Sequence, residues 1–287
     1  MRTDQNPEGT GDKTLRELGF TLIYPCFGQE KRISRLLKVW DAWSDDIKDN
    51  VQILLIDDHG TPSVEDMLLD KTMDCNLAVY RIQDDVKYNL PGALNLGIMV
   101  ASTPWILTMD TDYSFEPAVM QRLLSFKPHQ KEVYSFFLDT VIAGIHQSSD
   151  TRVHTNTFLL HKDVFTDLNG FDEDFSGKWS NALQPVLRKL GDSSLPLKFS
   201  KSIQGYGYHD NSFLQKLQDA GYTYVKQHGY FATEWRDDKV DENIEYTAVN
   251  RRLCKGIYNA KRQGKLAFST DMLRFKWKKV SQQRRST

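Results

Sequence analysis

Short apolar segments alternate with helical patterns over the first half of the chain. Residues 31–43 and 91–102 show the apolar spacing of helices. Four further segments are rich in β-branched and aromatic residues, which is typical of buried strands: 20–27 (FTLIYPCF), 51–58 (VQILLIDD), 77–82 (LAVYRI) and 104–110 (PWILTMD). Later strands are expected at 132–144 and 153–165. This alternation predicts an α/β fold with a mostly parallel sheet that helices cover on both faces.

Acidic residues follow two of the predicted strands. Asp57 and Asp58 end one strand, and Asp110 and Asp112 follow another. Ligands of open α/β sheets bind beyond the carboxyl ends of the strands. We therefore expect these four carboxylates to border one shared crevice.

The Asp110-Thr111-Asp112 triplet indicates a metal site. Two carboxylates in a turn can converge on Mg²⁺ or Mn²⁺, which prefer oxygen ligands. A departing diphosphate needs such a cation, because negative charge accumulates on it. Aspartate is also common in turns, so the triplet alone does not indicate a metal site. Its position directly after a buried strand is what favours one. Asp57 and Asp58 could contact a nucleobase or ribose, or could form a solvated turn that caps the next helix.

The segment Asn89–Gly97 opens the second predicted helix. Free amide groups at the helix start, together with Asn89 and Asn95, could reach the sugar or phosphates of a donor. The same residues could instead cap the helix, while Gly92 and Gly97 allow close packing on the sheet. Both interpretations stay open.

Two glycine-containing turns follow later in the chain. The first spans 169–173, and the second spans 205–210 and leads into an amphipathic helix. Asp210 is either a helix cap or the general base that takes a proton from an acceptor hydroxyl. His209 taken alone is typical of a buried structural histidine. Aromatic residues near these turns could stack on sugar rings or pack in the core: Trp179, Tyr206, Tyr208 and Trp235.

Composition and charge set limits on the function. The 287 residues include 37 Lys and Arg and 38 Asp and Glu, and the net charge of -1 gives no overall attraction to nucleic acid or anionic lipid. The three cysteines lack metal-ligand spacing, which fits a reducing compartment. We see no signal peptide and no apolar run long enough to cross a membrane, and we expect a cytoplasmic protein.

Basic residues gather at the C-terminus. Residues 250–287 contain twelve Lys or Arg and one acid, Asp271, with apolar residues between them. We expect a helical extension from residue 236 that packs on the main domain. The alternative is a basic surface that contacts a membrane or, as a non-catalytic module, nucleic acid.

The order of these motifs resembles the large inverting glycosyltransferase family with the GT-A fold, typified by bacterial polysaccharide synthases. The motifs are the strand ending in Asp57-Asp58, Asn-x-x-Gly-Ala-x-Asn-x-Gly, the strand with Asp110-x-Asp112, Asn-Gly-Phe-Asp-Glu, and Gly-Tyr-Gly-Tyr-His-Asp before a helix. The resemblance covers residues 20–235. It implies a Rossmann-like, mostly parallel mixed sheet in a domain of residues 1–235, with 1–18 as a loose lead-in and 236–287 as the extension.

The resemblance implies a donor site and a metal site. Asp57 or Asp58 matches the acid that contacts the nucleoside, usually uridine, and Asp110 and Asp112 match the pair that binds Mn²⁺ or Mg²⁺, with Asp112 as the direct ligand. The remaining donor candidates are Asn89, Gly92, Asn95 and Asp110. Many members place a metal-binding histidine shortly after the base-bearing helix, and here His228 or Glu234 is the candidate.

The resemblance also implies an acceptor site. Asp210 matches the catalytic base, and Asp172 and Glu173 match a loop that borders the acceptor pocket. Trp179 and His209 are further acceptor candidates, although His209 stands where the family commonly has Glu. Leu94 stands where many members carry a basic residue.

These implications predict a metal-dependent inverting glycosyltransferase that uses a nucleotide-sugar donor and a glycan or glycoconjugate acceptor, with no nucleic acid as partner. Peripheral membrane contact through the basic C-terminus stays open. A nucleotidyltransferase that acts on sugar phosphates is the enzymatic alternative. It is disfavoured because the region TLIYPCFGQEKR has one glycine and lacks a glycine- and arginine-rich phosphate loop.

Overall fold

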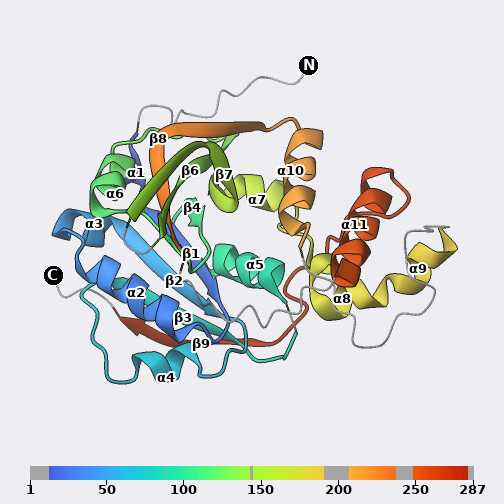
Figure 1. Cartoon of the computed structure of the whole chain (residues 1–287), viewed down its shortest axis with the longest axis horizontal. Coiled ribbons are helices and arrows are strands. Elements are labelled where there is room, and N and C mark those ends of the chain that lie inside the picture. Colours follow the sequence, from blue (N-terminus) through green and yellow to red (C-terminus); the bar gives the residue numbers. More distant parts are fainter. Residues whose placement is uncertain (1–12, 87, 143–144, 191–206, 237–247, 284–287) are drawn as a thin grey trace, which may run out of the picture.

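The computed structural model describes residues 13–86, 88–142, 145–190, 207–236 and 248–283. Within these residues the chain forms one mixed sheet of nine strands, in the order β5-β8-β6-β7-β4-β1-β2-β3-β9, with helices on both faces (Figure 1). The predicted α/β fold with a mixed sheet is thereby confirmed.

The parallel part of the sheet comprises β1 (Phe20–Cys26), β2 (Val51–Asp57), β3 (Asn76–Ile82) and β4 (Trp105–Thr108). β1 lies between β2 and β4, and β2 lies between β1 and β3; all three pairs are parallel. These strands lie close to the four predicted segments. Their carboxyl ends meet at one edge of the sheet.

The other part of the sheet is mostly antiparallel. It comprises β5 (Tyr113–Ser114), β6 (Glu132–Ile142), β7 (Ile145–His161) and β8 (Thr223–Arg236). β7 pairs antiparallel with β4 and β6, and β8 pairs parallel with β6 and antiparallel with β5. Because β8 pairs with β5, its last residues return to the Asp110–Asp112 turn.

Helices cover both faces of the sheet, and a separate hydrophobic core lies on each face. One core includes residues of α1 (Leu15–Leu18), α2 (Glu30–Asp41), α3 (Asp45–Asn50), α4 (Val64–Leu68) and α6 (Pro117–Leu124). The other includes residues of α5 (Leu90–Val100), α7 (Lys162–Asp167) and α10 (His209–Asp219). Alternation along the strands divides the two cores, since Leu22 and Tyr24 face the first and Ile23 faces the second.

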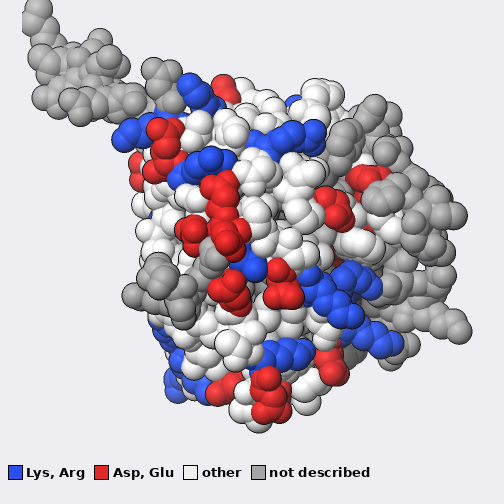
Figure 2. Space-filling model, turned by 90° about the vertical axis from the view of Figure 1, so that its left-hand side faces the viewer, with Lys and Arg blue, Asp and Glu red and all other residues white. Residues whose placement is uncertain are grey.

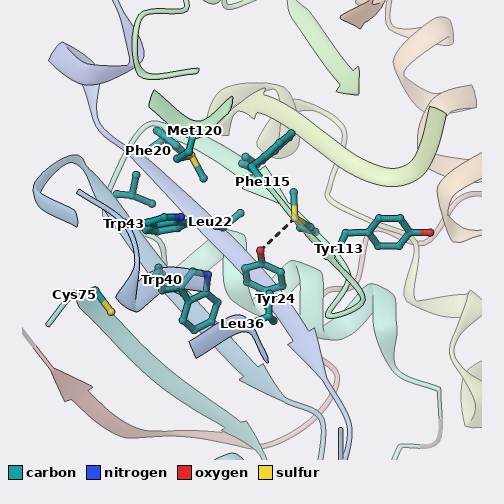
Figure 3. Close-up of a cluster of buried hydrophobic side chains, with 14 of the residues drawn as sticks. Phe20, Leu22, Tyr24, Leu36, Trp40, Trp43, Cys75, Tyr113, Phe115 and Met120 are labelled. Atoms are coloured by element: carbon teal, nitrogen blue, oxygen red, sulfur yellow. Dashed lines mark hydrogen bonds between the residues drawn. The ribbon is translucent and has the colours of Figure 1, made fainter. Parts of the chain in front are cut away.

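Aromatic residues fill the first core (Figure 3). The Tyr24 and Trp40 ring centroids lie 5.4 Å apart, and the Tyr24 hydroxyl donates to Met109 Sδ over 3.2 Å. Tyr113 lies at the rim of this cluster with its hydroxyl directed away from it (Figure 3). The core therefore extends to the turn that carries Asp110 and Asp112.

A third, smaller core lies beside the sheet. It joins the 3₁₀ turn η1 (Glu173–Phe175), α9 (Gln184–Lys189) and α11 (Ala248–Arg262) through Phe175, Leu187, Leu253 and Ile257. The short helix α8 (Gly177–Ala182) connects η1 to α9. The basic C-terminal region thus contributes an amphipathic helix to a packed cluster.

The C-terminal region differs from the predicted helical extension. α11 is helical, but Trp277–Gln283 forms β9, which pairs antiparallel with β3 and completes the sheet. The sequence WKKVSQQ lacks an apolar run because β9 is an edge strand, where lysines discourage pairing with other chains. The expectation of a helix throughout 236–287 is wrong for this segment, and residues 237–247 and 284–287 lie outside the described residues.

Two expectations concern the chain start and the membrane. Within the expected loose lead-in, Leu15–Leu18 forms α1 with a capping box between Thr14 and Glu17, while residues 1–12 lie outside the described residues. In the part of the chain that the structure describes, none of the helices has the length and apolar character needed to cross a membrane.

Candidate active site

The four predicted carboxylates lie at the same edge of the sheet. Asp57 ends β2, and its main chain pairs with Cys26 at the end of β1. Asp110 and Asp112 follow β4, on the other side of β1. Two strand spacings of about 4.8 Å separate β2 from β4, so the two acidic pairs are about 10 Å apart across the sheet.

The Asp57 carboxylate binds other parts of the chain. Its side chain is 1% exposed and accepts hydrogen bonds from the backbone of Gly60 (2.7 Å) and Val64 (3.1 Å). Arg81 on β3 forms an ion pair with Oδ2 of the same carboxylate. These three bonds shape the loop after β2. Asp57 therefore has the turn-forming role that was one of its two predicted interpretations, but it is buried and not solvated.

Asp58 has a different environment. It is 7% exposed, and its Oδ2 accepts the backbone N–H of Asn89 over 3.2 Å. Burial, together with the neighbouring charge of Asp57, raises the pKa of Asp58 to about 7, although the hydrogen bonds of Asn89 lower it. Of the two acids, Asp58 is therefore the one whose bonding is incomplete.

Asn89 and Gly92 connect this edge to later parts of the chain. The buried Asn89 side chain accepts a hydrogen bond from Ser176 Oγ (3.0 Å). A Cβ at Gly92 would lie 2.3 Å from Asn89 Oδ1 and 2.6 Å from Phe275, so the glycine permits close packing here. The helix start is a packing site, and Asn89 borders Asp58.

Asn95 anchors a turn. Its amide donates to the Phe171 carbonyl (2.9 Å) and to Glu173 Oε1 (3.0 Å), and its carbonyl accepts the Phe171 N–H (2.8 Å). With 0% exposure, Asn95 has no surface to offer a donor in this structure.

The two acids expected near the acceptor are also buried in internal contacts. Asp172 and Glu173 are each 0% exposed. Asp172 Oδ2 lies 2.8 Å from Lys261 Nζ on α11, and burial raises the pKa of Asp172 while Lys261 opposes this. Glu173 accepts the backbone N–H groups of Leu273 (2.7 Å) and Arg274 (3.2 Å). Both carboxylates hold the C-terminal segment, and neither presents surface to an acceptor in this structure.

Asp110 is held by two residues of β7. His154 Nε2 lies 3.3 Å from Asp110 Oδ2, and Asn156 Nδ2 donates to the same oxygen over 3.1 Å. Burial by itself raises the pKa of Asp110, but His154 and Asn156 together hold the pKa below its ordinary value. Asp110 therefore stays ionised at neutral pH.

Asp112 is less constrained. Its side chain is 26% exposed, and Arg32 on α2 approaches it at 3.9 Å. Burial and the nearby charge of Asp110 raise the pKa of Asp112 to about 6. Its carbonyl accepts the backbone N–H of Trp235 over 2.8 Å.

Glu234, and not His228, is brought to this turn. Glu234 pairs with Tyr113 across β5 and β8 and accepts the Tyr113 hydroxyl over 3.1 Å. His228 is exposed, and its ring packs on Phe137 at 4.5 Å. It lies six residues earlier on β8, at the irregularity where the pairing with β6 skips from Gln227 to Phe231. The structure does not bring His228 together with Asp110 and Asp112.

The predicted base lies at the start of α10. Asp210 is half-buried in the first turn of the helix, next to the buried His209. Burial lowers the pKa of His209, although the charges of Asp210 and Asp110 raise it. His209 is therefore a buried histidine, as its residue type taken alone predicted. Gly205 and Tyr206 of the preceding turn lie outside the described residues.

The aromatic acceptor candidates differ in their contacts. Trp179 on α8 packs under the Arg274 guanidinium, 4.6 Å from its ring centroid. Trp235 donates through Nε1 to Ser114 Oγ (3.0 Å), and Arg35 lies 5.3 Å from its ring centroid. Trp235 thus lies beside the Asp110–Asp112 turn, whereas Trp179 lies with the C-terminal segment.

Several residues at this edge were not predicted from the sequence. His154 and Asn156 are two positions apart on β7, so their side chains share one face of the strand. That spacing was visible in VHTNTF, but nothing in it names Asp110 as the partner. Arg32 and the 57% exposed Phe27, directly after β1, were also missed.

Asp110 and Asp112 suit a hard divalent cation. Two neighbouring carboxylates repel each other when both are ionised, and a cation bound between them would remove this repulsion. Among the described residues, no group of three or more His, Cys, Asp or Glu side chains is arranged to hold a metal ion. A bound phosphate or water would supply further oxygen ligands to a cation held by this pair.

The surface charge on one face is mixed. On the face that Figure 2 shows, acidic and basic side chains lie interspersed, as the net charge of -1 suggests. Among the described residues on this face, neither sign forms one extended area.

Comparison with known sequences gives one match. The model of the family described as glycosyl transferase family 2 matches residues 21–183. No curated protein matches the chain.

Solved structures share the fold at low sequence identity. The mannosyltransferase PcManGT from Pyrobaculum calidifontis, in complex with GDP-Man and Mn²⁺, has a TM-score of 0.55 and 11% identity, over 87% of this chain and 65% of that one. S. aureus TarS 1-349, in complex with UDP-GlcNAc, has a TM-score of 0.51 and 13% identity, over 80% of this chain and 62% of that one. The chain spans less than two thirds of the length of either protein.

Proposed function

Because the chain belongs to glycosyl transferase family 2, we propose that it moves a sugar from a nucleoside diphosphate to a hydroxyl of a glycan or glycoconjugate, with inversion. The chain is a glycosyltransferase with the GT-A fold. The finer points of the proposal are the metal, the donor nucleotide, the acceptor and the stereochemistry.

The observation that carries the proposal is the pair Asp110 and Asp112 beyond β4. Asp110 is kept ionised by His154 and Asn156, while burial and the nearby charge of Asp110 raise the pKa of Asp112 to about 6. These two side chains would hold Mn²⁺ or Mg²⁺, with Glu234 nearby on β8. The chemistry such a cation supplies is neutralisation of the charge on a departing diphosphate.

The donor nucleoside is proposed to bind across β1. Asp58 has incomplete hydrogen bonding at the end of β2 and can accept bonds from a base or ribose. Phe27, which is 57% exposed after β1, offers a ring to the flat face of a base. UDP is the favoured nucleotide. TarS binds UDP-GlcNAc and PcManGT binds GDP-Man, so both nucleotides belong in a test.

Asp210 is proposed as the general base. Its carboxylate takes the proton of the acceptor hydroxyl as that oxygen forms a bond to the anomeric carbon and the bond to the diphosphate breaks. Attack from the face opposite the diphosphate inverts the configuration. Half-burial at a helix start suits this role, because the site keeps access to an acceptor.

A thermal-shift screen tests the donor and metal parts of the proposal. UDP-, GDP- and dTDP-sugars are each added with and without Mn²⁺ to the wild type, to Asp112→Asn and to the exposed-site control Asp70→Asn. We expect one nucleotide sugar to raise the Tm in the wild type and the control only when Mn²⁺ is present, by mass action. A shift that is equal without Mn²⁺ would contradict metal-dependent binding, and a Mn²⁺-dependent shift that is unchanged in Asp112→Asn would contradict Asp112 as a ligand.

The products separate this reaction from nucleotidyl transfer. Sugar transfer releases a nucleoside diphosphate, whereas nucleotidyl transfer to a sugar phosphate releases pyrophosphate. Chromatography of the reaction mixture, followed by NMR of the anomeric proton, gives both the leaving group and the stereochemistry. Pyrophosphate or a retained anomeric configuration would refute the proposed reaction.

A further inference from the structure

His154 approaches Asp110 from β7. Its Nε2 lies 3.3 Å from Asp110 Oδ2, and the side chain is 12% exposed. Asn156, on the same face of β7, donates to the same oxygen over 3.1 Å. Two donors from one strand thus converge on a single oxygen of a residue that follows another strand.

The imidazole ring of His154 is itself held in place. Its Nδ1 lies 2.9 Å from the hydroxyl of Thr157, which is 0% exposed. The Tyr113 ring packs against it, with centroids 3.9 Å apart and planes inclined by 36°. Tyr113 in turn donates its hydroxyl to Glu234 (3.1 Å). The ring is therefore fixed on one face and at both nitrogens.

The partners determine the protonation of the ring. An ionised carboxylate only accepts hydrogen bonds, so the nitrogen that faces Asp110 carries the proton. A hydroxyl can donate to the other nitrogen, so Thr157 stabilises the Nε2–H tautomer. Carboxylates that bind a metal are in turn held by hydrogen bonds from neighbouring groups, and an imidazole fixed in one tautomer and one orientation can provide such a bond.

We infer that His154 is a positioning residue that, with Asn156, fixes the Asp110 carboxylate through Oδ2 and so directs Oδ1 to a divalent cation. This inference rests on the proposed function. Asp112 provides the contrast, since its nearest charged partner is Arg32 at 3.9 Å. In this inference the Asp110 carboxylate is already oriented before the cation binds, whereas the Asp112 side chain reorients when the cation binds.

Mn²⁺ affinity measured without turnover tests the inference. Free Mn²⁺ is followed by electron paramagnetic resonance as the full chain is titrated in the presence of UDP. His154→Leu removes the donor, His154→Gln keeps an N–H close to the position of Nε2, and the exposed His129→Leu is the matched control. Loss of such a support typically weakens metal binding about 10–100-fold. We expect that loss in His154→Leu, and near wild-type affinity in the other two variants. Wild-type affinity in a folded His154→Leu would overturn the inference, as would an equal loss in His154→Gln.

A second measurement does not need the metal. ¹⁵N-labelled histidine in the wild type should show His154 as the Nε2–H tautomer, with its signals assigned by their absence in His154→Gln. Asp110→Asn should shift the Nε2 signal. An Nδ1–H tautomer, or a signal insensitive to Asp110→Asn, would overturn the inference. If the wild type binds no Mn²⁺ with any nucleotide, the metal part of the proposed function fails, and the tautomer still decides the role of His154.

Discussion

Asp210 is the residue on which the proposed reaction depends most directly. It occupies the first turn of α10, half-buried beside His209, where an acceptor hydroxyl could reach it. The opposite end of the same helix carries Asp219, which is exposed and accepts a hydrogen bond from Gln215 over 2.8 Å. The two acids share an element but differ in environment.

Asp210→Asn should lower kcat while donor binding is unchanged. General-base assistance contributes about 10²–10⁴-fold in rate, and an amide cannot take the acceptor proton. Steady-state kinetics with the donor found in the screen give kcat, and calorimetry gives the donor Kd. Asp219→Asn serves as the control and should behave as wild type. Full turnover in Asp210→Asn would remove this residue from the mechanism.

Asp58→Asn should make the protein more stable at pH 8 and bind the donor less well. The pKa of Asp58 is raised from 3.8 to about 7 in the fold, so the ionised form is disfavoured there. The resulting loss of stability is fully present above pH 7 and disappears as the pH falls from 7 to 4. We expect a gain of about 2 kcal/mol at pH 8 and almost none at pH 4, because the full shift sets a limit of about 4 kcal/mol.

Urea unfolding at the two pH values measures this difference. The exposed Asp70→Asn controls for a simple change of net charge and should show no comparable pH dependence. An equal effect of Asp58→Asn at pH 4 and pH 8 would show that the Asp58 carboxylate is not destabilised by burial.

Helix α5 shows how an element is fitted to the sheet. A Cβ at Gly97 would lie 2.5 Å from Ile23 Cγ2 on β1 and 3.2 Å from Ile56 Cγ1 on β2. Met99, two positions later, is 47% exposed. The glycine allows α5 to approach β1 and β2, the two strands at the proposed donor site.

Gly97→Ala should destabilise the protein, although alanine favours helices. Helix propensity alone would add about 1 kcal/mol of stability, so a loss identifies the steric conflict. Overpacking of a filled core costs about 1–3 kcal/mol. Thermal unfolding of Gly97→Ala and of the surface control Met99→Ala gives the comparison. A higher Tm for Gly97→Ala would show that the strands move apart at little cost.

Elements were predictable to different degrees. β1, β2 and β3 were recognisable because a buried parallel strand is apolar on both faces. β9 was not, since it is an edge strand of exposed and half-buried residues with lysines at Lys278 and Lys279. The pairing of β5 with β8, which brings Glu234 to the Asp110–Asp112 turn, also has no local signal.

The C-terminal segment ties the whole molecule together. Lys261 Nζ lies 2.8 Å from Asp172 and 2.7 Å from Asp174, and Arg274 Nη2 donates to Asp174 over 3.0 Å. Phe275 packs against Gly92 at the start of α5. At least two cations of the basic C-terminus therefore neutralise buried acids, and they are not available to a membrane.

Lys261→Met should cost much of the stability of the fold. The Lys261 and Asp172 side chains are 0% exposed, so removal of the cation leaves the buried Asp172 carboxylate without its ion-pair partner. Breaking a buried pair in this way costs about 3–5 kcal/mol. Chemical unfolding measures the loss, with the exposed Lys265→Met as the control from the same segment. Equal stabilities of the two variants would contradict a structural role for this pair.

The sequence alone determined the buried parallel strands, the strand-end acids and the family, because apolar periodicity and turn chemistry are local properties of the chain. The tertiary structure decided which polar groups are already satisfied. Asp110 meets Asn156 across 46 positions, and Asp174 meets Lys261 across 87. Asp57, Asn95, Asp172 and Glu173 looked like ligand contacts in the sequence, yet they bind other parts of the chain. The partner of a buried charge depends on how distant segments pack, and local sequence does not encode that.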